Sequence, residues 1–141
     1  MPFKVEVLNY VDELSKEVKH IGAANTITNN NGYLRAYNTD WVGVYNYLNT
    51  LSIPFLTILG NGGFSKAVQY ACNLLNIDFD IIERDQWNLV PQLEGIIFNC
   101  TPVEVYTKGK LIDGRPSTLS GKSIASLQAN EQFKIYTDGI S

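Results

Sequence analysis

Apolar residues in the middle of the chain form strand-sized runs, interrupted by glycines and by one helical pattern. Phe55 to Leu59 is nearly all apolar, as expected for a strand covered on both faces of a parallel sheet. Glycines follow, and Phe64 to Leu75 then repeats apolar residues at helical spacing. Strand-like runs return at 78–83 and 95–99, with room between them for only a short helix. The pattern predicts an α/β fold in three layers, with a small, mostly parallel sheet in the middle.

The first third of the chain has a different pattern. Apolar residues three and four positions apart predict a helix from Val5 to Lys19. Two strand-like runs, 24–28 and 33–37, flank an Asn-Gly dipeptide, which is a strong hairpin-turn signal. A second helix is expected over Trp41 to Leu51, with residues 38–40 as its N-terminal cap.

The last third is rich in glycine and loop-forming residues. Leu111 and Ile112 suggest one more short strand, and 123–136 has the pattern of a closing helix. We therefore divide the chain into a first part with a hairpin and a linking helix, a central sheet domain, and a closing helix, at residues 1–51, 52–120 and 121–141.

Composition is typical of a soluble globular protein. Apolar residues make up 45% of the 141 residues, charged residues make up 18%, and the formal net charge is -3. Nothing in this balance favours nucleic-acid binding, and the apolar runs are too short to span a membrane. The start of the chain lacks a signal-peptide pattern, so a cytoplasmic protein is expected. Cys72 and Cys100 lack metal-ligand spacing, and we expect reduced thiols and no metal site.

The glycines after the first central strand suit a phosphate-binding turn. Gly60 can turn the chain off the strand, Gly62 allows a ligand close to the backbone, and residues 63–65 begin a helix with unpaired N–H groups. Ser65 replaces the third glycine of the dinucleotide fingerprint, but Glu83 ends the next strand where a ribose-binding acid belongs. The bland alternative is a strand-to-helix connector. The combined context favours a Rossmann-like dinucleotide-binding domain.

Six short segments along the chain match the motifs of one enzyme family in order. They are Pro2-Phe3-Lys4, Ile21 to Ile27, Tyr37 to Gly43, Gly60 to Ala67, Asn99-Cys100-Thr101-Pro102, and Gln128 to Phe133 with Gly121 upstream. Together they resemble the shikimate dehydrogenase family. The resemblance implies NADP-dependent hydride transfer that interconverts 3-dehydroshikimate and shikimate, a step of aromatic amino-acid biosynthesis, with a small-molecule substrate.

The resemblance also implies residue roles. Lys4 and Asp40 would be the catalytic acid/base pair, and Asn25 and Gln128 would bind the hydroxyls of the substrate. The cofactor would contact the glycine loop, the end of the second strand, the end of the third strand and the start of the last segment, at Gly60, Asn61, Gly62, Gly63, Phe64, Ser65, Glu83, Arg84, Thr101 and Gly121. The local pattern alone suggests simpler roles for the first four residues. Lys4 would be a terminal lysine and Asp40 a helix cap. Asn25 would be a turn residue and Gln128 a surface amide.

Cofactor choice depends on Glu83, Arg84 and Asp85, which stand where the family usually has Asn-Arg-Thr. Arg84 could bind a 2′-phosphate and favour NADP, whereas Glu83 could bind a free 2′-hydroxyl and favour NAD. We favour NADP because Arg84 aligns with the arginine of the family, and NAD remains the alternative.

The chain also departs from the family. It begins inside the lysine motif, without the Ser-x-Ser pair that holds the substrate carboxylate, so 1–51 would be a remnant of a substrate domain in a truncated or reduced member. The alternative function is a non-catalytic module that binds a dinucleotide or metabolite, or an isolated fragment of such an enzyme.

Overall fold

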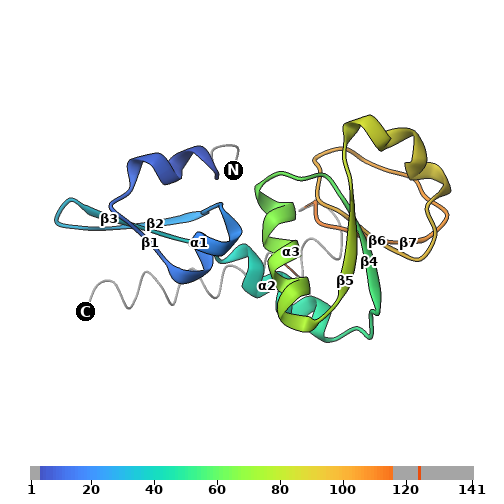
Figure 1. Cartoon of the computed structure of the whole chain (residues 1–141), viewed down its shortest axis with the longest axis horizontal. Coiled ribbons are helices and arrows are strands. Elements are labelled where there is room, and N and C mark those ends of the chain that lie inside the picture. Colours follow the sequence, from blue (N-terminus) through green and yellow to red (C-terminus); the bar gives the residue numbers. More distant parts are fainter. Residues whose placement is uncertain (1–3, 116–123, 125–141) are drawn as a thin grey trace.

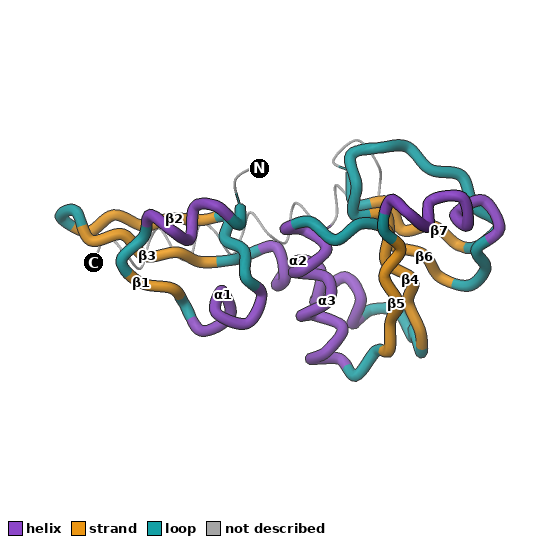
Figure 2. The backbone as a smooth tube through the Cα atoms, turned by 45° about the horizontal axis from the view of Figure 1, so that its top comes forward, coloured by secondary structure: helices purple, strands orange, loops and turns teal. Residues whose placement is uncertain are grey.

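The computed structural model describes residues 4–115 and Ile124. These residues form two lobes, each built around one sheet, with the helices α2 and α3 between the sheets (Figure 1). The first lobe holds the three-stranded sheet β1-β3-β2, and the second holds the four-stranded sheet β5-β4-β6-β7. Figure 2 shows the chain passing from the first lobe to the second through α2 (Asp40–Asn49).

The predicted helix from Val5 to Lys19 is wrong. A 3₁₀ helix, a two-residue strand and a short α-helix replace it: η1 (Glu6–Tyr10), β1 (Glu13–Leu14) and α1 (Lys16–Ile21). The backbone at Asp12 and Ser15 bonds instead to Leu34 and Ala36 of the neighbouring strand, at 2.8 and 3.0 Å. The apolar residues that suggested the helix still share one cluster with Ala24 and Ala36, namely Val7, Leu8, Val11, Leu14 and Val18. Their spacing therefore indicates that they pack into the same cluster, and it does not indicate one continuous helix.

The hairpin is confirmed. Strands β2 (Thr26–Asn30) and β3 (Tyr33–Tyr37) pair antiparallel, with Thr26 opposite Tyr37 and Asn30 opposite Tyr33. Asn31 and Gly32 make the turn, with φ of 52° and 89°. Asparagine and glycine adopt this left-handed backbone region more easily than other residues, which is why the dipeptide predicted the turn.

The second lobe has the predicted α/β fold. Its elements are β4 (Phe55–Leu59), α3 (Gly63–Leu75), β5 (Asp78–Ile82), η2 (Arg84–Gln92), β6 (Ile96–Asn99) and β7 (Lys110–Asp113). All strand pairs in this sheet are parallel, and the order reverses at β4, which lies between β5 and β6. The connection before β6 is a 3₁₀ helix, in agreement with the short helix expected there.

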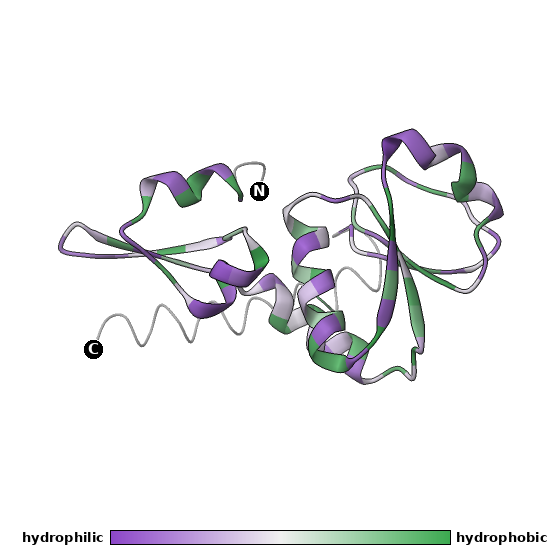
Figure 3. Cartoon of the chain, viewed as in Figure 1, coloured by the Kyte–Doolittle hydropathy of each residue, from purple (hydrophilic) through white to green (hydrophobic). Residues whose placement is uncertain are grey.

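Both faces of the second sheet are covered by apolar side chains. Leu56 and Ile58 of β4 pack against α2 and α3 in one cluster, whereas Leu59 faces a second cluster that includes Val90 of η2. Figure 3 shows the hydrophobic character of β4, as expected for a strand buried on both faces. Ile124, part of the predicted closing helix, is helical and belongs to the first cluster; the rest of 123–136 lies outside the described residues. No helix in residues 4–115 combines the length and apolar composition needed to cross a bilayer.

Gly109, just before β7, packs closely against Gly95 and Ile97 because it has no side chain. A Cβ atom at this position would lie 2.3 Å from the backbone oxygen of Gly95 and 2.7 Å from Cδ1 of Ile97. We expect Gly109→Ala to lower the free energy of unfolding by about 2–3 kcal/mol, because the clash is with backbone that cannot move freely. Urea denaturation measures the change. Gly62→Ala is the control, since a Cβ there would meet no atom within 4 Å from any described residue other than its chain neighbours. Equal stability of the two variants would contradict the prediction.

Candidate functional site

Gly60 brings the ends of three strands together. Its φ is +95°, a backbone conformation that residues with a side chain rarely adopt. Its N–H donates to the carbonyl of Ile82 at the end of β5, at 2.8 Å. A Cβ at Gly60 would lie 2.9 Å from Cγ2 of Thr101, just beyond the end of β6. Glycine at this position therefore lets the turn pack directly against Thr101.

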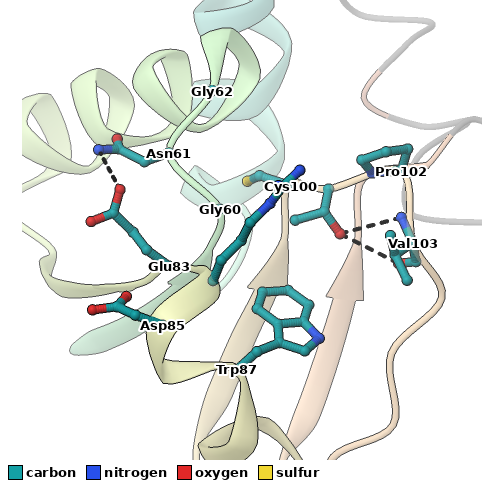
Figure 4. Close-up of a pocket in the computed structure, with 11 residues that line it drawn as sticks. Gly60, Asn61, Gly62, Glu83, Asp85, Trp87, Cys100, Pro102 and Val103 are labelled. Carbon is teal, nitrogen blue, oxygen red and sulfur yellow. Dashed lines mark hydrogen bonds between the residues drawn. The ribbon is translucent and has the colours of Figure 1, made fainter.

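A pocket of about 1050 Å³ opens at these strand ends (Figure 4). It lies where the strand order reverses, which is where open parallel sheets bind ligands. Its lining comes from the glycine turn, the start of η2 and the segment after β6: Gly60, Asn61, Gly62, Glu83, Arg84, Asp85, Trp87, Cys100, Thr101, Pro102 and Val103. Six of the predicted cofactor-binding residues are thus in one cavity, namely Gly60, Asn61, Gly62, Glu83, Arg84 and Thr101.

The start of α3 fits a dinucleotide pyrophosphate. Gly62 is the N-cap of this helix, and no side chain of the described residues caps it. The space around Gly62 is open: apart from its chain neighbours, no described residue has an atom within 4 Å of where a Cβ would be. The first-turn N–H groups at residues 63–65 and the positive end of the helix dipole are therefore available to an anion beside the pocket.

A chain of hydrogen bonds joins the glycine turn to the end of β5. The Asn61 amide donates to Oε1 of Glu83 at 3.4 Å, and Figure 4 shows these two side chains turned toward each other. Gln69 of α3 donates to Oδ1 of Asn61 at 3.0 Å and to Oγ of Ser65 at 3.1 Å. Glu83 therefore lies beside the glycine turn, where a ribose-binding residue of such a fold would be.

Asn99, the last residue of β6, holds the pocket-lining segment that follows this strand. It was not among the predicted site residues. Its buried side chain accepts hydrogen bonds from the backbone N–H of Thr101 at 3.0 Å and from its hydroxyl at 2.7 Å. Its amide donates to the carbonyl of Val103 at 2.8 Å. The sequence signal was present, since Asn99 begins the Asn-Cys-Thr-Pro segment. Pocket-lining Trp87 and Pro102 were also not among the predicted site residues, although Pro102 ends the same Asn-Cys-Thr-Pro segment.

The two cysteines are free thiols. Burial raises the pKa of Cys72 to about 12 and raises the pKa of Cys100 well above its usual range. Both thiols are therefore protonated near neutral pH, which makes them poor nucleophiles. Within the part of the chain that the structure describes, no cluster of His, Cys, Asp and Glu could hold a metal ion.

A second polar cluster contains Lys4 and Asp40. The Lys4 ammonium donates to Oδ2 of Asp40, and the two side chains are 13% and 1% exposed. Asp40 is the first residue of α2, so the helix dipole also favours its negative charge. The amide of Asn25 donates to Oδ1 of the same carboxylate at 2.9 Å. Three residues predicted from separate motifs thus meet at one point.

This cluster lies beside the start of α3. A Cβ at Gly63 would be 3.0 Å from both Cβ and Cδ of Lys4, so the lysine chain runs directly over this glycine. The Lys4 nitrogen is 5.7 Å from the ring centre of Phe64. Gly63 and Phe64, which do not line the pocket, therefore connect the glycine turn to the ion pair. Gln128 and Gly121 lie outside the described residues.

Comparisons with known proteins find similar sequences and similar folds. No family model matches the chain. Over 70 residues, 48% of the chain, it is 47% identical to a protein named shikimate dehydrogenase (NADP(+)) from Streptococcus pneumoniae strain CGSP14, and the match spans 25% of that relative. A relative from strain Hungary19A-6 is 46% identical over a segment of the same length. The matched segment is therefore a quarter of the length of these curated relatives.

Solved structures extend the similarity to nearly the whole chain. Shikimate dehydrogenase 1 from Peptoclostridium difficile has a TM-score of 0.73 and 24% identity, covering 98% of this chain and 69% of its own. Shikimate 5-dehydrogenase from Thermus thermophilus, solved with NADP(H) and shikimate, has a TM-score of 0.75 and 21% identity, covering 98% and 71%. The resemblance to shikimate dehydrogenases is thereby confirmed by sequence over 48% of the chain, and the fold is shared over nearly all of it.

Proposed function

We propose that the chain acts as an NADP-linked oxidoreductase of the shikimate dehydrogenase type and interconverts 3-dehydroshikimate and shikimate. The observation that carries the proposal is the position of the Lys4–Asp40 pair, directly beside the glycine that begins α3. A proton-transfer pair next to a dinucleotide cradle is what alcohol–ketone interconversion requires.

In the oxidation direction the substrate must lose a hydride from carbon and a proton from its hydroxyl. A bound dinucleotide would supply the hydride acceptor, the C4 atom of its nicotinamide. Lys4, in its neutral form, would take the hydroxyl proton, and the buried carboxylate of Asp40 would stabilise the ammonium that results. In the reduction direction Lys4 would return this proton to the oxygen as the hydride adds to carbon.

NADP is the proposed cofactor, and NAD is the alternative. The names of the relatives specify NADP(+), and Arg84 contributes to the pocket lining, where its guanidinium could bind a 2′-phosphate. Glu83 and Asp85 line the same region, and their carboxylates would repel the negative charge of the 2′-phosphate. The contact of Asn25 and Gln128 with substrate hydroxyls stays a prediction.

A second candidate is a module that binds a dinucleotide without catalysis. The observation that favours it is that every described residue lining the pocket belongs to the second lobe, between Gly60 and Val103. Dinucleotide binding would therefore not depend on Lys4, Asn25 or Asp40.

Two measurements on the same preparation test these proposals. Nicotinamide absorbance is followed after mixing the chain with shikimate and either NADP⁺ or NAD⁺, and calorimetry measures binding of each compound separately. Turnover with shikimate supports the oxidoreductase. Dinucleotide binding without shikimate binding supports the module, and binding of neither compound would refute both.

A further inference from the structure

The aromatic ring of Phe64 lies between the Lys4 ammonium and the core of the second lobe. Phe64 is the second residue of α3, directly after Gly63. The Lys4 nitrogen lies over its ring, 5.7 Å from the ring centre. A cation within about 6 Å of the centre of an aromatic ring is attracted by the negative charge on the ring face. The contact therefore joins a cation of the first lobe to a residue of the second.

Packing holds the ring of Phe64 in place. Its centre lies 6.0 Å from the ring centre of Phe98, which is fully buried, with the two planes at 57°. Gly114 lies beside it, and a Cβ atom there would be 2.8 Å from Cε1 of Phe64. The N–H of Gly114 donates to the carbonyl of Asn99 at 3.0 Å, which keeps this glycine next to the ring. The ring is therefore positioned by neighbours that do not depend on Lys4.

The contacts of Lys4 come from several parts of the chain. Its ammonium donates to Oδ2 of Asp40, whose side chain is almost fully buried. Its aliphatic part runs over Gly63, and its backbone carbonyl accepts from the N–H of Ala24 at 2.8 Å. A lysine side chain loses rotamer entropy when it is held in one position. A second contact at its charged end, on the Phe64 ring, offsets part of that loss and favours the position beside Asp40.

We propose that Phe64 is a positioning residue that holds the charged form of Lys4 beside Asp40. The inference rests on the proposed function, because the position of Lys4 affects turnover only if this residue transfers the proton. The ring attracts an ammonium and not a neutral amine, so it acts on the form of Lys4 that donates the proton during reduction of 3-dehydroshikimate. It also ties the proton donor to the first turn of α3, where the dinucleotide pyrophosphate would bind.

Fluorination of the ring separates its electrostatic effect from its shape. Fluorine atoms withdraw electron density from the ring face and change the size of the ring only slightly, so the attraction for a cation weakens in steps. With one and then three fluorine atoms on Phe64, kcat for reduction of 3-dehydroshikimate by NADPH is expected to fall stepwise, by about threefold or more in total. The KM for 3-dehydroshikimate should change little. The same analogues at Phe79 are the control and should leave kcat unchanged, since this half-buried ring packs against the same core cluster.

Two outcomes of the fluorination series would overturn the proposal. One is a kcat that stays constant when Phe64 is fluorinated. The other is a changed affinity for NADPH at constant kcat, measured by calorimetry, because the ring would then act on the cofactor and not on Lys4.

A double-mutant cycle tests the contact without activity. Lys4→Met, Phe64→Leu and the double variant are compared with the unaltered chain by urea denaturation, and both substitutions keep apolar bulk at the site. The combined effect on the unfolding equilibrium constant is expected to differ by about threefold or more from the product of the single effects. Effects that simply multiply overturn the proposal. Absence of turnover in the unaltered chain, by contrast, refutes the proposed function, while this cycle still decides whether Phe64 holds Lys4.

Discussion

Asp40→Asn is expected to lower kcat for shikimate oxidation by about a thousandfold, within the range of positioned acid/base catalysis. Asparagine keeps the size of the side chain but removes the negative charge that stabilises the Lys4 ammonium. The affinity for the dinucleotide should be unchanged, because Asp40 does not line the pocket at the glycine turn. Steady-state kinetics with shikimate and calorimetry with NADP⁺ measure the two quantities.

Asp80→Asn serves as the control for loss of a carboxylate, because this side chain is exposed on β5 in the second lobe. The control should retain the kcat of the unaltered chain. If Asp40→Asn also retained it, Asp40 would be no more than the first residue of a helix, and the assignment of the proton-transfer pair would be wrong. Urea denaturation of both variants separates loss of activity from loss of fold.

Arg84→Ala is expected to weaken NADP⁺ binding by about 10- to 100-fold, as for the loss of a charge-assisted hydrogen bond to phosphate. Binding of NAD⁺ should change little, because NAD⁺ lacks the 2′-phosphate. Glu83→Gln is expected to act in the opposite direction and to strengthen NADP⁺ binding, since it removes a negative charge from the same part of the pocket. Calorimetric titration with each dinucleotide gives the ratio of affinities.

Arg35→Ala is the matched control, because Arg35 is a half-exposed arginine of the first lobe that pairs with Glu13. It should leave both affinities unchanged. If Arg84→Ala weakened NADP⁺ and NAD⁺ equally, Arg84 would bind a part common to both cofactors, and selection of the 2′-phosphate would have to be assigned to another residue.

Local sequence patterns were sufficient for much of the second lobe. The run from Phe55 to Leu59 was predicted as a strand because a parallel strand buried on both faces needs apolar residues throughout, and the structure confirms it. The helix from Gly63 to Leu75 followed from apolar spacing and from the glycines before it. Such signals are carried by residues close together in the chain.

The failed helix in the first lobe shows where local patterns stop being sufficient. Five apolar residues of this segment have helical spacing, namely Val7, Leu8, Val11, Leu14 and Val18. The strand β1, at Glu13–Leu14, nevertheless interrupts the segment. The bonds that decide this come from Leu34 and Ala36, on a strand that is distant in sequence. Pairing with that strand satisfies backbone groups that a helix would otherwise have paired locally.

The sequence by itself determined the α/β class, the glycine turn at Gly60 and the identity of the polar motif residues, because each depends on neighbouring residues or on a single backbone conformation. Only the tertiary structure decided which of those residues meet. Lys4 and Asp40 are 36 positions apart, and their ion pair exists because the hairpin and α2 bring them together over Gly63.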